Sequence, residues 1–170
     1  MFDNEDDLND LLEQMNEVAR KGWHRWRESY EGQQPAVAYM LMPGEDKPFT
    51  AVFEVLEHMP GTLEERVSTI ANLGYKASQQ FGNVQVFFLM QEAWSAQVDS
   101  EEDIPDGPVK SMYESVEVLV ASGLTYDGTM IAEQPINGDD LGDCTRNLVT
   151  DDVQAPLVEA FWEGYSQGQN

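Results

Sequence analysis

Basic residues are scarce in this chain. Nine lysines and arginines stand against 32 aspartates and glutamates in 170 residues, which gives a formal net charge of −23 at pH 7. So strong a negative field repels nucleic acid, anionic membranes and phosphate-rich ligands, and it favours cations or cationic protein surfaces. We therefore expect no direct nucleic-acid partner and no membrane partner. A solubilising surface, salt adaptation or a selected acidic binding face would each account for the charge.

Cysteine and long apolar runs are also scarce. Cys144 is the single cysteine, which excludes an internal disulfide and fits a reducing compartment. Residues 1–10 are acidic where a secretory signal would be basic and then apolar. The longest apolar run, residues 84–90, is far shorter than the ~18 residues that cross a bilayer. These absences predict a cytoplasmic protein.

Several familiar catalytic and metal-binding motifs are missing as well. The chain holds no Walker loop and no GxGxxG, HExxH or CxxC pattern. The acidic loop at residues 137–143 offers Asp139, Asp140 and Asp143 as candidate metal ligands. It departs from an EF-hand loop, because Leu141 stands at the fifth position, where that loop has an oxygen ligand. We expect no cofactor, and the three aspartates are the metal candidates.

The composition indicates one folded domain. Hydrophobic residues make up 41% of the chain, enough for a packed core, and the length suits a single domain over residues 1–170. We expect residues 1–4 and 166–170 to be flexible. Apolar spacing and turn residues predict three helices, over residues 5–30, 62–81 and 153–165. They also predict five strands, over residues 36–42, 49–56, 84–90, 113–121 and 129–136. The predicted class is α+β, with a mixed, mostly antiparallel five-stranded sheet covered by about three helices in the order α-β-β-α-β-β-β-α.

Three glutamates lie in or beside strands that are otherwise apolar. Glu54 and Glu117 each stand between two apolar neighbours, and Glu92 follows the central apolar run. A half-buried carboxyl group has a raised pKa and serves as a general acid or base, so two converging carboxylates would form a catalytic pair. The competing interpretation is that strand alternation places each carboxylate on a solvent-facing side. Glu54, Glu92 and Glu117 are therefore the catalytic candidates.

A short stretch of the first predicted helix concentrates tryptophan and arginine, the residue types enriched at binding hot spots. Trp23, Arg25, Trp26 and Arg27 are the binding candidates, for an acidic partner protein or for a second copy of this chain. The competing interpretation is that the tryptophans cover the sheet while the arginines pair with nearby acids.

Three functions remain open at this point. The scarcity of catalytic signatures and the aromatic residues of the first helix favour a non-enzymatic protein-binding or self-associating module. The acidic charge also suits a DNA mimic that inhibits a basic nucleic-acid-binding protein. The three glutamates would instead support a small carboxylate-dependent or metal-assisted hydrolase. The binding module is our leading hypothesis, and it favours a protein that is not an enzyme.

Overall fold

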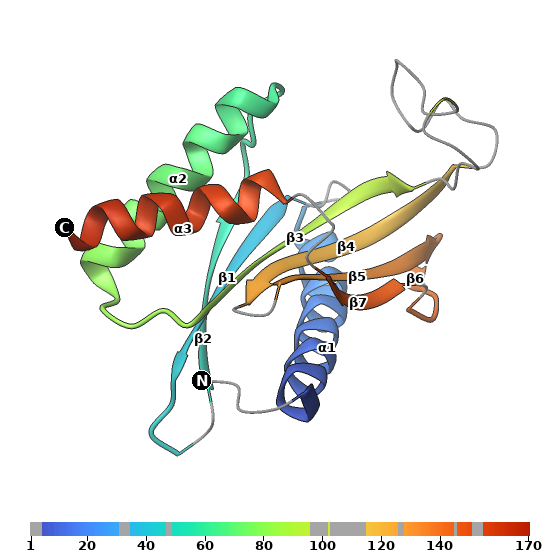
Figure 1. Ribbon diagram of the computed structural model, residues 1–170. Coiled ribbons are helices and arrows are strands. Elements are labelled where there is room, and N and C mark those ends of the chain that lie inside the picture. Colours follow the sequence, from blue (N-terminus) through green and yellow to red (C-terminus); the bar gives the residue numbers. More distant parts are fainter. Residues whose placement is uncertain are drawn as a thin grey trace.

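The computed structural model describes residues 5–30, 35–46, 49–95, 102, 115–125, 128–144, 146–150 and 155–170. Within these ranges lie the helices α1 (Glu5–Ser29), α2 (Leu63–Gln80) and α3 (Pro156–Gln169). The strands are β1 (Ala36–Pro43), β2 (Phe49–Leu56), β3 (Val86–Ser95), β4 (Val116–Thr125), β5 (Gly128–Asn137), β6 (Asp140–Leu141) and β7 (Arg146–Thr150) (Figure 1).

The predicted α+β class is confirmed. All neighbouring strands in the described ranges pair antiparallel, in the spatial order β2-β1-β3-β4-β5-β6, and β7 also pairs with β5. Strands β2 and β3 both run antiparallel to β1, so they run parallel to each other. Helix α2 is the crossover that connects them. The strand order places β2 at one edge of the sheet.

The prediction of five strands was too low. Six strands have five residues or more, and β6 adds a pair of residues. Residues 137–143 were expected to form a loop, but Asn137 pairs with Asp140 across a turn in which Gly138 has a φ of 66°. Glycine adopts this left-handed conformation without a steric penalty, which permits so tight a turn. The chain then continues into β7, which is too short to show a clear alternating pattern.

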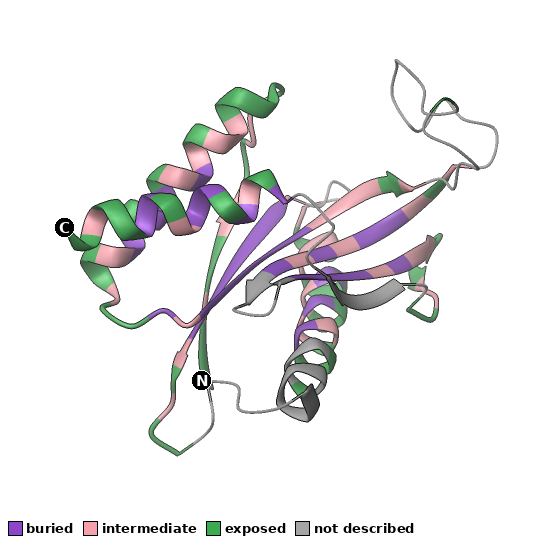
Figure 2. Cartoon of the chain, in the orientation of Figure 1, coloured by how far each residue is buried: buried purple, intermediate pink, exposed green. Residues whose placement is uncertain are grey.

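The sheet is packed on both of its faces (Figure 2). On the first, which we call the α1 face, Trp23 joins Tyr39 and Phe88 in one buried cluster. Helices α2 and α3 cover the other, the α2–α3 face, where Phe161 stacks on Phe87 with ring centroids 3.9 Å apart. Successive strand residues point to opposite faces, so the neighbours Phe87 and Phe88 belong to different cores.

Strand β3 is shared by the two cores. Residues 86–90 have no exposed surface, and β3 lies between β1 and β4, so the apolar run that predicted a strand over residues 84–90 lies at the centre of the sheet. The predicted start of α2 is also confirmed, because Thr62 Oγ1 accepts a hydrogen bond from the Glu65 amide at 3.3 Å.

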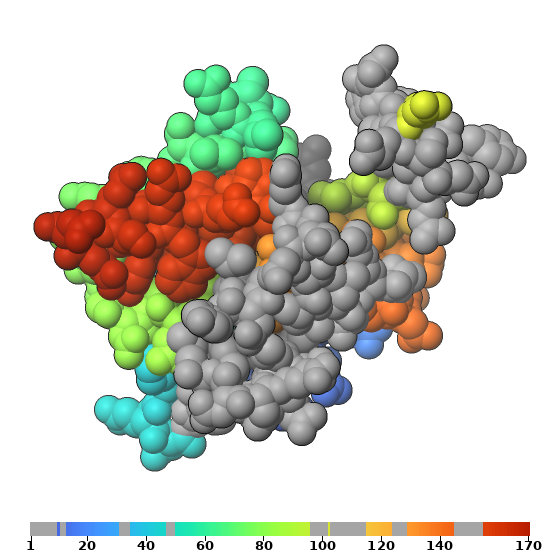
Figure 3. Space-filling model, in the orientation of Figure 1, coloured from blue at the N-terminus to red at the C-terminus, as the bar shows by residue number. Residues whose placement is uncertain are grey.

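Helices α2 and α3 lie side by side, and the end of the β1–β2 hairpin projects beyond them (Figure 3). Helix α3 runs to Gln169, so residues 166–169, expected as part of a flexible tail, are helical. Residues 1–4, the other expected tail, lie outside the described residues. None of the helices in the described ranges combines the length and the apolar character that crossing a bilayer requires.

Candidate functional site

The sheet brings two of the three candidate glutamates onto one face. Glu92 pairs with Leu119, which belongs to the cluster on the α1 face. Glu117 lies two residues before Leu119 and therefore points to the same face. Glu54 alternates with the residues of β2 that point toward α1, so it points to the α2–α3 face, where it is exposed. A convergence of all three carboxylates is therefore absent.

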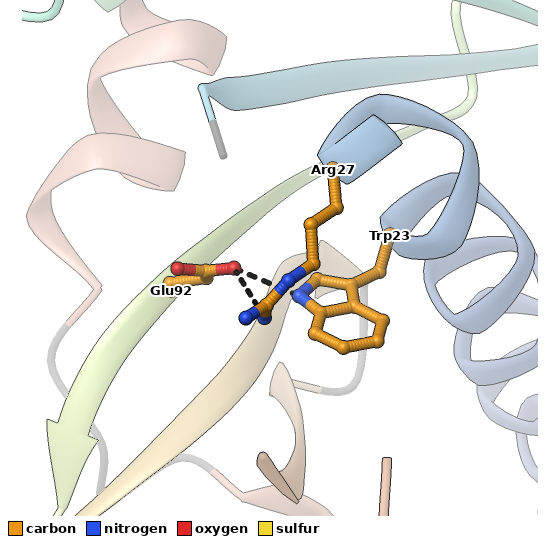
Figure 4. A network of polar contacts seen from close by, with 3 residues as sticks. All are labelled: Trp23, Arg27 and Glu92. Atoms are coloured by element: carbon orange, nitrogen blue, oxygen red, sulfur yellow. Dashed lines mark hydrogen bonds and ion pairs between the residues drawn. The ribbon is translucent and has the colours of Figure 1, made fainter. Parts of the chain in front are cut away.

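Glu92 is held by two side chains of α1 (Figure 4). The Trp23 indole Nε1 donates a hydrogen bond to Glu92 Oε1 at 2.8 Å, and Arg27 Nη1 lies 3.8 Å from the same oxygen. The Arg27 guanidinium also lies 4.7 Å from the centre of the Trp23 ring, a cation–π contact. Since Trp23 is fully buried, these contacts fix α1 to β3.

Opposing effects act on the ionisation of Glu92. Burial raises its pKa above the ordinary value, and the nearby negative charge of Glu117 raises it further. The hydrogen bond from Trp23 and the positive charge of Arg27 lower the pKa. A raised pKa suits a general acid or base, but Glu92 Oε1 is already engaged by α1. The contacts therefore indicate that Glu92 anchors the helix.

The four binding candidates divide into two pairs. Trp23 and Arg27 face the sheet and belong to the Glu92 network. Arg25 is exposed and Trp26 is half-buried, and the Arg25 guanidinium lies 5.0 Å from the centre of the Trp26 ring. Arg25 is the most exposed of the four, whereas Arg27 keeps 26% of its side chain exposed beside Glu92.

Arg25 and Trp26 belong to a mixed apolar and cationic surface that also includes β1 and β2. We call it the α1–β2 surface and define it as Lys21, Arg25, Trp26, Tyr39 and Phe53. Phe53 is 45% exposed, and its ring centre lies 5.3 Å from that of Trp26 and 6.2 Å from that of Tyr39. These residues, with Val18 and Gly22, line a depression of about 220 Å³.

The indole N–H of Trp26 is an unusual polar group of the α1–β2 surface. Its Nε1 atom is buried and makes no hydrogen bond of standard geometry with the described residues. Burial raises the pKa of the Tyr39 hydroxyl, and the neighbouring Trp26 indole lowers that pKa. A buried donor in this state is uncommon in folded proteins.

The candidate metal ligands lie at the β5–β6 turn and beyond it. Asp139 and Asp140 are exposed, and Asp143 lines a depression of about 480 Å³ together with Cys144 and Arg20. In the part of the chain that the structure describes, no group of three or more histidine, cysteine or acidic side chains is arranged to hold a metal ion. The Arg20 guanidinium donates instead to the Gly142 carbonyl at 3.3 Å.

Residues 164–168 match the GxSxG pattern of hydrolase nucleophile elbows. Such an elbow requires a sharp turn between a strand and a helix. Here the pattern lies inside α3, and the Ser166 carbonyl accepts a hydrogen bond from Asn170 Nδ2 at 3.2 Å. Gly164 is buried against the backbone of Ala71 in α2. Residues 164–168 therefore do not form a nucleophile elbow, and Gly164 serves the packing of α3 on α2.

Sequence reasoning missed Phe53 and Tyr39 as parts of the candidate site. Their only sequence signal is alternation, which places Phe53 on the same side of its strand as Ala51 and Val55. At the α1–β2 surface the exposed Phe53 lies beside the half-buried Trp26 at a sheet edge, and the buried Tyr39 lines the same depression. In comparisons with known proteins, the chain matches no family model, no curated protein and no solved structure.

Proposed function

We propose that this chain is a non-enzymatic protein-binding module and that the α1–β2 surface is its binding site. The observation that supports it most is the exposure of Phe53 beside Trp26 and Arg25. Phe53 is 45% exposed, and a partner that covers this aromatic side chain lowers the free energy by removing apolar surface from water. Tryptophan and arginine next to it are the residue types that dominate binding energies at protein interfaces.

The geometry gives less support to the hydrolase hypothesis. Glu54 points away from Glu92 and Glu117, and the oxygen of Glu92 nearest α1 is engaged by Trp23 and Arg27. The DNA-mimic hypothesis makes a different prediction from ours, because a mimic binds through carboxylates. Its affinity for a basic partner would not depend on Phe53.

Replacing Phe53 with alanine tests this proposal. We expect the immobilised wild-type protein to retain a partner from a lysate of the cells that naturally produce it. The Phe53→Ala variant should bind the same partner, once purified, at least about tenfold more weakly, because each ~1.4 kcal/mol of lost contact energy is a factor of ten in Kd. Phe53 is nearly half-exposed at the sheet edge, so the variant should keep its fold.

The matched control is Tyr75→Ala, which removes another exposed aromatic side chain, 48% exposed, from α2. This variant should bind the partner as the wild type does. Equal binding by wild type and Phe53→Ala would contradict the proposal. Loss of binding in both variants would also contradict it, because the effect would then not be specific to the α1–β2 surface.

A further inference from the structure

Strand β2 is an edge that lacks the usual protection against pairing. It pairs with β1 over eight consecutive residue pairs without a bulge, and no other strand in the described ranges pairs with it. Its sequence, FTAVFEVL, contains no proline and no lysine, and Glu54 is its single charged residue. Natural edge strands are usually short, charged, bulged or covered, because an open edge accepts another strand.

One hydrogen bond shows which residues of β2 turn their backbone groups outward. The Leu41 carbonyl accepts from the Gln85 amide at 2.9 Å, so Leu41 points its backbone groups toward β3. Successive residues in an antiparallel strand alternate between the two neighbouring strands. Met40 and Met42 therefore point toward β2, and their partners Val52 and Thr50 bond to β1. The alternate residues of β2, namely Phe49, Ala51, Phe53 and Val55, point their backbone groups away from the sheet.

Three of these residues, Ala51, Phe53 and Val55, have their side chains on the α1 face. Ala51 and Phe53 are exposed, which leaves room for a chain beside them. A strand added to this edge would place alternate side chains against Phe53 and the depression of the α1–β2 surface. The volume of about 220 Å³ is enough for one large side chain.

Charge selects among the segments that would fit. Arg25 forms no ion pair with the described residues, and the pair between Lys21 and Glu17, 3.2 Å apart, is exposed and therefore weak. Arg25 lines the depression and is therefore a cation that a carboxylate on the incoming segment can pair with. On the opposite face the neighbouring residue of β2 is Glu54, which disfavours a second acid. The net charge of −23 opposes strongly acidic partners, a second copy of the chain among them, so the segment carries a single carboxylate for Arg25.

We propose that the partner supplies an extended segment that pairs with β2 as an additional strand. The segment carries an apolar or aromatic residue and a carboxylate at alternate positions, facing Phe53 and Arg25. This inference rests on the proposed function, because it specifies how the α1–β2 surface binds. Strand addition obtains affinity from backbone hydrogen bonds and specificity from alternate side chains.

The test uses a phage-displayed library of random peptides of about ten residues, long enough for one strand. Selection is carried out on the wild type, on Phe53→Ala and on Ala51→Pro. Proline at position 51 removes an outward N–H and leaves the bonds to β1 intact, because the Ala51 amide does not face β1. We expect peptides with apolar residues and Asp or Glu at alternate positions to be enriched on the wild type. Synthetic copies should bind Ala51→Pro and Phe53→Ala at least about tenfold more weakly, as measured by fluorescence anisotropy.

A second measurement does not depend on the folding of a variant. The enriched peptide is N-methylated at one set of alternate amides or at the other set. We expect one set to abolish binding to the wild type and the other to leave it unchanged, because only one set faces β2. The Arg25→Glu variant should shift the selected peptides from acidic to basic residues.

The outcomes separate this inference from the proposed function. Peptides that lose affinity for Phe53→Ala but bind Ala51→Pro and both N-methylated forms normally would overturn strand addition and leave the binding site in place. Peptides that bind all variants equally would overturn both proposals. The absence of enriched peptides, or enrichment of basic peptides on the wild type, would overturn strand addition. So would a wild-type dimer in light scattering that Ala51→Pro abolishes, since the edge would then bind a second copy.

Discussion

The Gly164→Ala substitution is expected to lower the free energy of unfolding by about 2–3 kcal/mol, the upper part of the range for overpacked cores. Alanine is the better helix former by ~1 kcal/mol, so propensity alone predicts the opposite sign. The reason is the close contact of α2 and α3. A Cβ atom on Gly164 would overlap the backbone carbonyl of Ala71, and one on Gly74 would overlap that of Phe161. Backbone atoms cannot turn aside, so the helices would have to separate.

Chemical denaturation of Gly164→Ala, Gly74→Ala and Gln167→Ala measures this effect. Gln167 is exposed in the same helix, so its replacement should change stability by no more than ~0.5 kcal/mol. Both glycine variants should be strongly destabilised, with the α2–α3 face losing its packing. If Gly164→Ala were as stable as Gln167→Ala, the close contact between the two helices would be refuted.

The Trp23→Ala substitution should cost about 3–5 kcal/mol of stability, the range for removing a fully buried large aromatic side chain. Trp23 has no exposed surface, and it packs between α1 and the sheet with Met15 and Ala19. Its removal would leave a cavity and would also take away the hydrogen bond to Glu92 and the ring beneath Arg27. Thermal and denaturant unfolding measure the loss.

The Trp23→Phe variant separates the hydrogen bond from the packing. It keeps most of the volume but removes the donor that lowers the pKa of Glu92, so that pKa should rise further above its ordinary value of 4.5. An acid whose pKa is higher in the folded state releases its proton first in the unfolded state as pH rises. Stability therefore falls as pH rises from the unfolded pKa toward the folded pKa. This fall should be steeper in Trp23→Phe than in the wild type and should vanish in Glu92→Gln.

An unchanged pH profile in Trp23→Phe would contradict the anchoring role of Glu92. The comparison is made on the pH dependence of the unfolding free energy, so a uniform loss of packing energy does not affect it.

Local patterns predicted much of the fold. Alternation in β2 correctly separated Phe53 from Glu54, and the uninterrupted apolar run of β3 correctly marked the central strand. Both signals depend only on neighbouring residues. β6 and β7 were not predicted, because a two-residue strand and a five-residue strand are paired through contacts with β5 that leave little local trace.

The candidate site was predicted only in part. Trp23 and Trp26 lie three residues apart on the same apolar stripe, so periodicity could not tell that the first is buried and the second reaches the surface. What decides between them is the position of α1 on the sheet, which depends on Glu92, 69 residues away from Trp23. Phe53 becomes a surface residue because β2 is the edge strand, and strand order is a long-range property.

The central claim is that β2 is an open edge whose outward backbone groups are available to a partner. Amide hydrogen exchange in the free protein, followed by NMR, tests it most directly. We predict an alternating pattern, in which the amides of Val52 and Glu54 are protected by β1 while those of Ala51, Phe53 and Val55 exchange rapidly. Equal protection of all five amides would show that the edge is already paired, and it would contradict the claim.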